Sequence, residues 1–447
     1  MKLLAEIVGA EHVLTDPDLT ASYETDWTGR FRGSAACVVR PGTSDEVAAV
    51  VRACAAEGQR ITVQGGNTGL VGGSVPAGGE VLLSLTRLNV LGEVDPTSSQ
   101  VTAGAGVTLA VLQGRARDAG FDFGVDLAAR DSATVGGLVA TNAGGIRVLR
   151  YGSMGHQVVG LTAVLADGSV ISRMAGLEKD GTGYDLLSLL AGSEGTLAVV
   201  TEARLRLVPR YRARAVALLA MDSTASAVAV LPGLRAALPS LAAAELFYAP
   251  GLALVRKHGG LAAPFPVEHP AYLLVECADL VDPTAQLVEA VQTAEGLVDA
   301  RIADDAAGQR ALWAYRETHT ESIGAEGVPV KLDVSVPVSS LPALVDRLEP
   351  TIKAVCPGAR AIVFGHVNEG NLHVNVLDTG ELHEEVTDAV LQLVATLDGS
   401  ISSEHGVGRA KVPWLGLSRS PAEIEAMRAI KRALDPTGLL NPGVLFP

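Results

Sequence analysis

The sequence predicts an α+β protein with two main domains and a C-terminal segment. At 447 residues the chain exceeds one ordinary core. Short apolar runs alternate with capped helical patterns from residue 35 onward, and the character of the chain changes near Pro209. We therefore expect a helical lead-in over residues 1–34, a first domain over 35–210, a second over 211–400 and a C-terminal segment over 401–447.

The first domain begins with a strand–helix–strand unit. Ala35–Pro41 is a short apolar strand, and Thr43 with Glu46 matches a capping box for the helix that follows and stops at Gly58. Arg60–Gln64 is the second strand and leads into a glycine-rich loop. The remaining expected elements of this domain are strands within residues 81–85, 100–103, 158–172 and 196–208 and a helix over residues 108–120.

The second domain mixes strands with amphipathic helices. Apolar, β-branched runs predict strands at residues 215–220 and 272–276, and periodic apolar positions predict helices at 283–295 and 340–355. The later segments 361–367 and 372–376 form a hairpin pattern, so an antiparallel sheet is expected.

Charge and cysteine usage exclude several classes of function. The formal net charge is −15 and no Lys/Arg run is present, so the sequence does not predict a nucleic-acid partner. The cysteines are far apart and form no CxxC pair, which argues against iron–sulfur and zinc-thiolate sites: Cys37, Cys54, Cys277 and Cys356.

The sequence predicts neither a transmembrane helix nor a signal peptide. The Ala/Leu-rich stretch 213–254 is interrupted by Asp222, Arg235 and Glu245, too often for a transmembrane span. The N-terminus carries Glu6 and no apolar core of a signal peptide. We therefore expect a cytoplasmic protein, and a homodimer is compatible with the sequence.

Three glycine-dense segments lie within the first domain: Gln64–Gly73, Ser132–Gly137 and Thr141–Gly145. Glycine allows close approach of the backbone to a ligand, and successive free N–H groups can bind anionic oxygens. A single such loop is more often a tight turn, and none of the three is a P-loop. Three loops carrying hydroxyl and amide side chains in one domain favour a bound dinucleotide.

The segment Ala361–Val376 carries two histidines in a hairpin pattern. With Asn368–Asn371 as a four-residue loop, His366 would lie directly opposite His373, close enough to share a metal ion. Alternation places Phe364, His366, His373 and Asn375 on one face. A structural histidine pair is the competing interpretation. Glu404, beside His405, offers a third ligand, which favours a metal site over a structural histidine pair. Two histidines and one carboxylate are typical of Zn, with Mn or Fe as alternatives.

Candidate groups for substrate carboxylates lie in the second domain. Residues 313–320 predict a helix that presents Arg316 and Thr320 on one face, and residues 328–336 predict a strand that carries Lys331 and Asp333 on one side. Taken alone, these are ordinary surface charges.

Several long motifs resemble one family of flavoproteins. They are SATVGGLVATNAGGIRVLRYG at residues 132–152, VLADG at 164–168, KDGTGYDL at 179–186 and GSEGTL at 192–197. These segments resemble the FAD-binding core of the PCMH/vanillyl-alcohol-oxidase-type flavoproteins, and the likeness extends from about residue 36 to the C-terminus. Within that family the D-2-hydroxy-acid dehydrogenase branch is most similar, since residues 365–376 and 404–408 match its GHxxxGNLHxNx and EHGxG motifs.

The resemblance implies a PCMH-type FAD-binding domain of two α+β subdomains, a substrate (cap) domain, and a C-terminal segment that returns to the flavin. It implies FAD with the loops at 64–73 and 132–145 on the pyrophosphate, and we expect a non-covalent flavin because the two main loops carry no histidine or cysteine. The expected cofactor-binding residues are Gln64, Gly65, Gly66, Asn67, Thr68, Gly69, Leu70, Gly72, Gly73, Ser132, Thr134, Gly136, Gly137, Asn142, Gly144, Gly145, Gly195 and Asn441.

The same resemblance implies roles in the second half of the chain. His366, His373 and Glu404 would bind the divalent metal, and His405 would be the general base, a task suited to an imidazole whose ordinary pKa is near 6.5. The expected substrate contacts are Arg316, Thr320, Lys331 and Asn375. The hairpin loop carries Asn368-Glu369 where members of the branch commonly carry Gly-Asp.

The expected activity is oxidation of a D-2-hydroxy acid, foremost D-2-hydroxyglutarate to 2-oxoglutarate, with hydride passing from Cα to flavin N5. Electrons would then pass to a protein or soluble carrier. The same chemistry on D-lactate or glycolate is one alternative. A non-redox transferase of the alkyl-glycerone-phosphate synthase type is another, and a flavin-binding module without turnover is a third.

Overall fold

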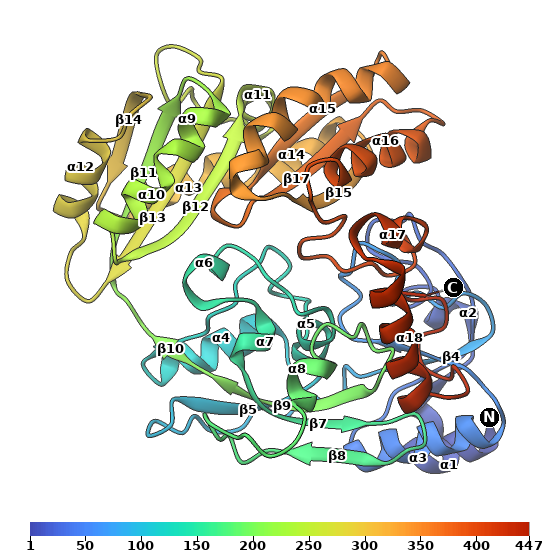
Figure 1. Cartoon of the computed structure of the whole chain (residues 1–447). Helices are drawn as coiled ribbons and strands as arrows, with labels where there is room; N and C mark the ends of the chain where they lie inside the picture. The colour runs from blue at the N-terminus through green and yellow to red at the C-terminus, as the bar shows by residue number, and fades with distance from the viewer. Residues whose placement is uncertain (447) are drawn as a thin grey trace. The chain divides into compact units, whose positions relative to one another are not determined.

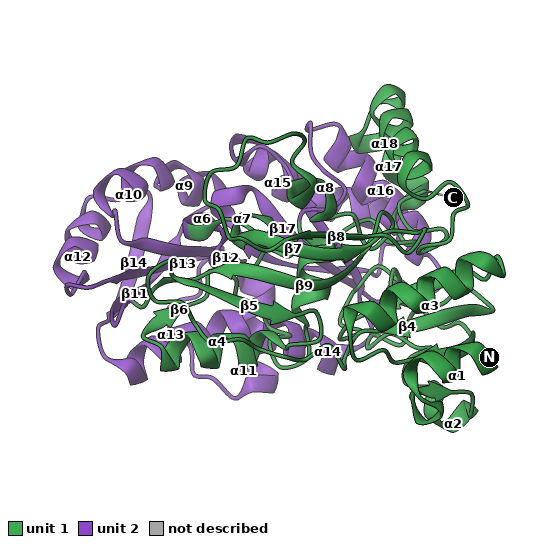
Figure 2. Cartoon of the chain, turned by 90° about the horizontal axis from the view of Figure 1, so that it is seen from below, with its two compact units in different colours: residues 1–145, 151–210, 404–447 green, residues 146–150, 211–403 purple. Residues whose placement is uncertain are grey.

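The computed structural model describes residues 1–446 and divides into two compact units (Figures 1 and 2). Unit 1 comprises residues 1–145, 151–210 and 404–447, and unit 2 comprises residues 146–150 and 211–403. The chain thus enters unit 2 briefly at Ile146–Arg150, enters it again at Tyr211 and returns to unit 1 at Glu404. The α+β class is confirmed, because both units contain sheets and helices.

The first sheet of unit 1 is built from the N-terminal elements. Its strand order is β1 (Val13–Leu14), β2 (Ala35–Val39), β4 (Glu80–Ser84) and β3 (Ile61–Gln64). The last three run parallel, which requires the crossover helix α3 (Ser44–Ala56). Residues 1–34, expected to be helical, also supply strand β1, and α1 (Lys2–Val8) packs Leu4 and Val8 into the core of this sheet.

Helix α3 begins as the sequence predicts, with one difference at its cap. The hydroxyl of Thr43 accepts a hydrogen bond from the Glu46 N–H at 3.1 Å, whereas the Glu46 carboxylate accepts from the N–H of Gly42 at 2.7 Å. The reciprocal half of the capping box is therefore made one residue earlier. The apolar face of the helix, Val47, Val50, Val51 and Cys54, is buried against the sheet.

The second sheet of unit 1 is antiparallel, in the order β5 (Gln100–Gly104), β9 (Val199–Arg206), β7 (Val158–Val164) and β8 (Val170–Arg173). The run at 158–172 folds into a hairpin that turns at Gly168, whose φ is 79°. Helices α4 (Leu109–Asp118) and α5 (Val135–Thr141) contribute Leu112 and Val139 to the core on this sheet.

Unit 2 is organised around a seven-stranded antiparallel sheet. Its order is β14 (Leu297–Ala303), β11 (Ala213–Met221), β13 (Ala271–Asp279), β12 (Leu241–Tyr248), β16 (Arg360–His366), β17 (Asn371–Leu377) and β15 (Val330–Ser335). The longer helices of this unit are α11 (Ala249–Gly259), α12 (Thr284–Gln292), α13 (Ala306–Glu317), α14 (His319–Glu326), α15 (Leu341–Val355) and α16 (His383–Ala395). Strands far apart in the sequence thereby become neighbours.

The remaining elements are short or lie near the C-terminus. Helix α18 (Pro421–Leu434) is fixed within unit 1, because the Lys431 ammonium donates to the carbonyl of Thr196 at 2.7 Å. The others are α2 (Pro17–Thr20), β6 (Phe121–Asp122), α6 (Val148–Tyr151), α7 (Met154–Gln157), α8 (Leu186–Leu190), β10 (Val208–Pro209), α9 (Thr224–Ala229), α10 (Leu231–Ala237), α17 (Leu415–Ser418) and the 3₁₀ turns η1 (Ala10–His12), η2 (Val338–Ser340), η3 (Val367–Glu369) and η4 (Val412–Trp414).

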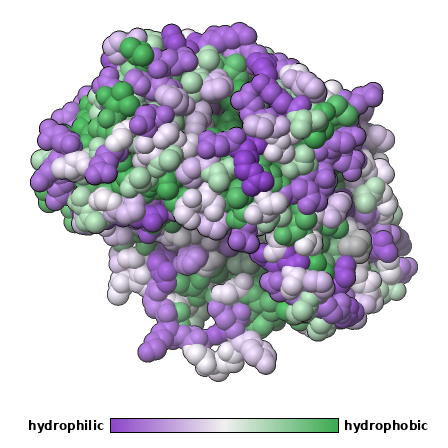
Figure 3. All heavy atoms as spheres, turned by 45° about the horizontal axis from the view of Figure 1, so that its top comes forward, coloured by the Kyte–Doolittle hydropathy of each residue, from purple (hydrophilic) through white to green (hydrophobic). Residues whose placement is uncertain are grey.

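Within residues 1–446, no helix combines the length and the apolar character needed to cross a bilayer. On the face drawn in Figure 3, hydrophobic residues are interspersed with hydrophilic ones.

Candidate active site and cofactor loops

The two histidines of the hairpin lie on one face of the sheet of unit 2, but their register differs from the predicted one. Phe364, not His366, is the residue opposite His373. The connection is the 3₁₀ turn η3 followed by Gly370 at φ 71°, so strand β17 already begins at Asn371. The prediction that His366 directly faces His373 is therefore wrong by two positions. A shift of two preserves the face, because side chains alternate with a period of two.

Despite the shifted register, the two imidazoles meet. Their ring centroids are 5.4 Å apart with the planes nearly perpendicular, and one nitrogen of each ring lies within 4.8 Å of the other. The Phe364 ring packs on His373 with a centroid distance of 5.1 Å. Two imidazoles at this separation form a donor set that suits Zn or a similar divalent ion.

Each histidine is paired across the sheet with a buried carboxylate. Glu245 of β12 lies opposite His366, and its Oε1 is 2.5 Å from Nδ1 of that ring. Asp333 of β15 lies opposite His373, with 3.4 Å between Oδ1 and Nδ1. Carboxylates that contact the second nitrogen of a metal-binding imidazole fix its tautomer and orientation.

The role of Glu245 was not recognised from the sequence. A signal existed, since it is the one charged residue in the run Leu241–Tyr248 and lies in a strand buried along most of its length. Burial by itself would raise the pKa of this carboxyl, but the adjoining His366 ring and the Arg316 guanidinium outweigh that effect and hold the pKa below its ordinary value. Glu245 is thus an anion at the centre of the sheet.

Arg316 and Thr320 lie on two helices, so the prediction of a single helix over residues 313–320 is wrong. The expected single helix is divided at Thr318 into α13 and α14, and Arg316 is buried whereas Thr320 is exposed. The guanidinium of Arg316 donates from Nε to Oε2 of Glu245 at 2.7 Å and lies 4.4 Å above the Phe364 ring. Arg316 therefore lies beside the histidine pair, with one of its donors already engaged.

Lys331 and Asn375 lie opposite each other on β15 and β17. Each is two residues from a member of the Asp333–His373 pair, on the same face of its strand. The amide of Asn375 makes only long contacts, at 3.4 Å, to the carbonyls of Ile362 and His373. The register thus groups an ammonium and an amide with the two imidazoles.

Asp333 also holds the start of the segment that leads to Glu404. Its Oδ2 accepts the N–H of Ser403 at 3.0 Å, and its Oδ1 accepts from the Asn371 amide at 2.8 Å. Ser403 is the last residue of unit 2, so Glu404 follows one peptide bond later, with about 3.8 Å between successive Cα atoms.

Within unit 1, Glu404 lies against one of the glycine segments. Its Oε1 accepts the N–H of Gly145 at 3.3 Å, and a Cβ on Gly144 would lie 3.2 Å from its carboxylate. The next turn is held by Glu194, which accepts the N–H groups of Val407 and Gly408 at 2.8 and 2.7 Å. Burial raises the pKa of Glu194, and these two N–H bonds oppose the shift.

The first two glycine segments meet within unit 1. A Cβ on Gly66 would overlap the carbonyl oxygen of Ser132, and one on Gly65 would overlap the hydroxyl of Thr134. Gly136 and Gly145 are likewise packed against Ala105 and the Asp126 carbonyl. These glycines are required by close contacts within the protein itself.

Other atoms of the glycine segments have no protein partner among the described residues. The Thr134 hydroxyl is buried without a hydrogen bond, and Gly69 has open space where a Cβ would lie. No backbone N–H from Gly65 to Gly73 donates to a protein acceptor in residues 1–446. An orphaned hydroxyl beside a row of unpaired N–H groups fits the anionic part of a dinucleotide.

Several other expected cofactor residues have side chains with protein partners. The Gln64 amide donates to the carbonyls of Tyr23 and Ser74, both at 2.9 Å. Asn142, at the left-handed end of α5, accepts the N–H of Gly155 at 2.8 Å. Asn441 accepts from Val63 at 2.7 Å and donates to Glu194 at 2.6 Å, with Gly195 packed against its amide. These side chains shape the loops.

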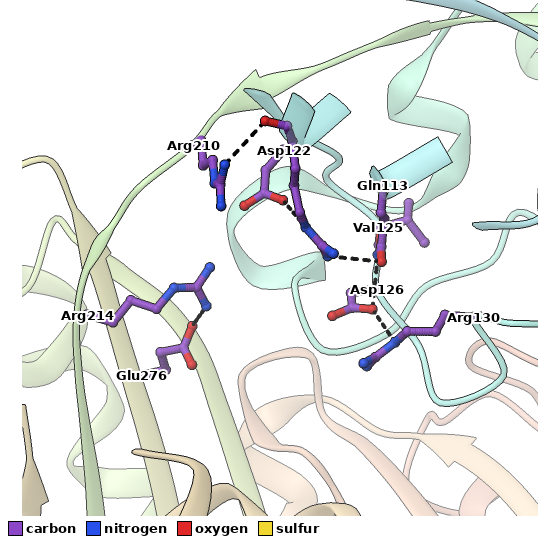
Figure 4. A network of polar contacts seen from close by, with 9 residues as sticks. Gln113, Asp122, Val125, Asp126, Arg130, Arg210, Arg214 and Glu276 are labelled. Carbon is purple, nitrogen blue, oxygen red and sulfur yellow. Dashed lines mark hydrogen bonds and ion pairs between the residues drawn. The ribbon is translucent and has the colours of Figure 1, made fainter. Parts of the chain in front are cut away.

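A network beside the second glycine segment holds the preceding loop (Figure 4). The Gln113 amide donates to the carbonyl of Val125 and to the carboxylate of Asp126, both at 3.1 Å, and Arg130 pairs with Asp126 at 3.1 Å. Because Ser132 follows Arg130 by two residues, this network fixes the entry into the segment at 132–145.

Comparison with known proteins gives matches over almost the whole chain. Residues 35–173 match a family described as FAD binding domain, and residues 210–445 match FAD linked oxidases, C-terminal domain. The chain is 39% identical to "D-2-hydroxyglutarate dehydrogenase" of Xanthomonas citri pv. viticola, over 99% of this chain and 96% of that protein. It is 38% identical to "D-2-hydroxyglutarate dehydrogenase, mitochondrial" of Bos taurus, over 97% of this chain and 81% of the relative.

Solved structures share the fold at low sequence identity. p-Cresol methylhydroxylase superposes with a TM-score of 0.78 at 17% identity, over 99% of this chain and 95% of that chain. An alkyldihydroxyacetonephosphate synthase superposes with a TM-score of 0.75 at 17% identity, over 97% and 82%. The PCMH-type fold is thereby confirmed, and these two likenesses say nothing of the reaction.

Proposed function

This chain belongs to the FAD-linked oxidases, and from that membership we propose that it oxidises D-2-hydroxyglutarate to 2-oxoglutarate. The glycine segments would hold FAD without a covalent link, and FAD would supply the acceptor for the hydride that leaves Cα. The orphaned Thr134 hydroxyl and the unpaired N–H groups of residues 65–73 support this placement of the cofactor.

The proposed metal ligands are His366, His373 and Glu404. They would hold a divalent cation, Zn foremost with Mn or Fe as alternatives, which would supply a Lewis acid for the substrate hydroxyl. The single observation that carries this proposal is the pair of imidazoles on one sheet face. The Nδ1 atom of each ring lies near a buried carboxylate of the neighbouring strand. The Ser403–Asp333 hydrogen bond supports Glu404 as the third ligand, because Glu404 is the next residue in the chain.

His405 is the proposed general base that accepts the hydroxyl proton. An imidazole with an ordinary pKa near 6.5 is suited to this task at neutral pH. Its neighbour Glu404 contacts Gly145 in the glycine segment within unit 1, which supports a position of His405 close to the bound cofactor.

The substrate is proposed to be a dicarboxylate because two cations accompany the histidine pair. Lys331 lies opposite Asn375 in the sheet, and Arg316 packs over Phe364 on the same face. Lys331, Asn375 and the donors of Arg316 not used by Glu245 would bind the carboxylates and orient Cα–H. D-Lactate and glycolate, which carry one carboxylate, are the alternative substrates. Thr320, an exposed residue near the start of α14, is the remaining proposed contact.

The reduced flavin is proposed to pass its electrons to an external protein or soluble carrier. All four cysteines are free and buried, and among the described residues none of them belongs to a group of three or more possible metal ligands.

Anaerobic titration tests the function directly. The flavin-loaded protein is mixed separately with D-2-hydroxyglutarate, D-lactate and glycolate, and the absorbance of the oxidised flavin is followed. We expect D-2-hydroxyglutarate to bleach the band at the lowest concentration. Preferential bleaching by a monocarboxylate would reassign the substrate, and no bleaching by any of the three would remove the dehydrogenase proposal in favour of a transferase or a non-catalytic flavoprotein.

A further inference from the structure

Glu245 is a buried anion whose two oxygens serve two different cationic or donor groups. Its side chain is 1% exposed, and burying a carboxylate costs several kcal/mol unless it is paired. Oε1 contacts Nδ1 of His366 at 2.5 Å, and Oε2 accepts from Nε of Arg316 at 2.7 Å. Each oxygen thus serves a different partner.

The contact with His366 determines which ring nitrogen can bind a metal. A carboxylate accepts hydrogen bonds, so the proton of the neutral imidazole resides on Nδ1 and the lone pair on Nε2 is left for coordination. The cross-strand register aligns the two residues, since Glu245 and His366 are direct partners on β12 and β16.

The contact with Arg316 orients the guanidinium in the same way. Glu245 takes one of its five N–H donors, and the Phe364 ring, 4.4 Å from the guanidinium carbon, supports its plane. Glu245 thus fixes one edge of the guanidinium and Phe364 fixes its plane, so the remaining N–H donors point in a defined direction.

We propose that Glu245 is a positioning residue that couples the metal-binding imidazole of His366 to the carboxylate-binding guanidinium of Arg316. This inference rests on the proposed function of the site. One carboxylate holds both groups, so a change in either partner is transmitted to the other. Metal affinity and recognition of the dicarboxylate are therefore energetically linked through Glu245.

The matched control is Glu276 on the neighbouring strand β13. It is a buried carboxylate that also accepts from an arginine, Arg214 at 2.9 Å (Figure 4), and from a ring N–H, that of Trp313 at 2.7 Å. It has no contact with either histidine of the hairpin in the described structure. Glu276→Gln therefore reproduces the loss of a buried charge without touching the proposed coupling.

The experiment measures zinc affinity of the flavin-loaded protein by competition with a chromophoric chelator, together with KM for D-2-hydroxyglutarate. We expect Glu245→Gln to weaken zinc binding 10- to 100-fold, in line with other changes behind metal-binding histidines, and to raise KM. Glu276→Gln should leave both values essentially unchanged, because the partners of Glu276 are Arg214 and Trp313 and not the hairpin histidines. Equal losses in the two variants, or unchanged zinc affinity in Glu245→Gln, would overturn the coupling.

Arg316→Met provides a second test that does not depend on the folding of the Glu245 variant. Arg316 is not a proposed metal ligand, yet its removal should weaken zinc binding, and the effects of Arg316→Met and Glu245→Gln should be non-additive in the double variant. Full zinc affinity in Arg316→Met would contradict the inference while leaving the proposed function intact. Absence of zinc binding by the unmodified protein would remove the metal from the proposed function, and the coupling with it.

Discussion

The carboxylate of Asp333 accepts the backbone N–H of Ser403 at 3.0 Å, which attaches the segment before Glu404 and His405 to strand β15. The same side chain lies opposite His373 and accepts from the Asn371 amide. Asp333, which is fully buried, thus contacts both strand β17, which carries His373, and the residue that precedes Glu404 and His405.

Asp333→Asn should lower kcat/KM at least tenfold and weaken metal binding by a similar factor. The amide group of Asn would point an N–H at a group that now donates a hydrogen bond to Asp333, so one buried donor would lose its acceptor. An unsatisfied buried donor lowers stability by about 1–3 kcal/mol. Asp299→Asn, at an exposed position of β14, is the control and should behave as the unmodified protein. Steady-state kinetics and chelator competition provide the measurements, and wild-type values in Asp333→Asn would contradict the assigned role.

Gly66 and Gly69 should respond oppositely to substitution by alanine. A Cβ at Gly66 would overlap the carbonyl of Ser132, so Gly66→Ala should destabilise unit 1 and reduce its flavin content. A Cβ at Gly69 meets nothing within 4 Å, so the flavin-free Gly69→Ala variant should unfold at an unchanged temperature. If that open space receives the cofactor, FAD affinity of Gly69→Ala should still fall. Thermal unfolding and flavin fluorescence titration separate these effects.

His319 should make the stability of unit 2 depend on pH. Burial and the charge of Arg316 lower its pKa from 6.5 to about 3, so the unfolded chain binds a proton that the folded protein does not. This contribution to stability is complete above pH 6.5 and is lost as the pH falls toward 3. Between pH 6.5 and 5 the loss is about 2 kcal/mol, at 1.36 kcal/mol for each pH unit.

His319→Asn retains a donor for the Arg316 carbonyl, which lies 3.2 Å from Nδ1, but cannot titrate. Urea unfolding at several pH values should therefore give a flatter acid limb for the variant, whatever its stability at pH 7. An acid limb as steep as that of the unmodified protein would assign the pH dependence to other groups.

The cysteines should be unreactive in the folded protein. All four are free and buried, and burial together with the nearby Cys37 raises the pKa of Cys54 to about 12. Because the thiolate is the reactive form, Ellman's reagent at pH 8 should react with essentially no thiol before denaturant is added and with four afterwards. Rapid reaction of the native protein would show that at least one of these thiols becomes accessible.

The hairpin tip should depend on Arg235. Its Nε and Nη2 donate to the side-chain and backbone oxygens of Asn368 at 2.8 and 2.7 Å. Arg235→Met should cost about 1–3 kcal/mol of stability, the usual range for charge-assisted hydrogen bonds, and raise the exchange rate of amide protons in η3. If amide exchange in residues 367–370 is the same in Arg235→Met and the unmodified protein, the Arg235–Asn368 hydrogen bonds do not rigidify the turn.

The sequence by itself determined the features that depend on local periodicity and turn chemistry. Alternation in the hairpin placed His366, His373 and Asn375 on one face. The predicted register was wrong by two residues, but the predicted face is unchanged because side chains alternate with a period of two. The capped helix after Thr43 and the clustered glycines were equally local signals.

Only the tertiary structure decided which distant residues serve the histidines. Glu245 and Asp333 reach them because β12 and β15 flank the hairpin in the sheet, and strand order is set by packing of the whole unit, which no local pattern encodes. The break at Thr318 likewise separated Arg316 from Thr320 and turned the arginine toward a carboxylate 71 positions away in the sequence.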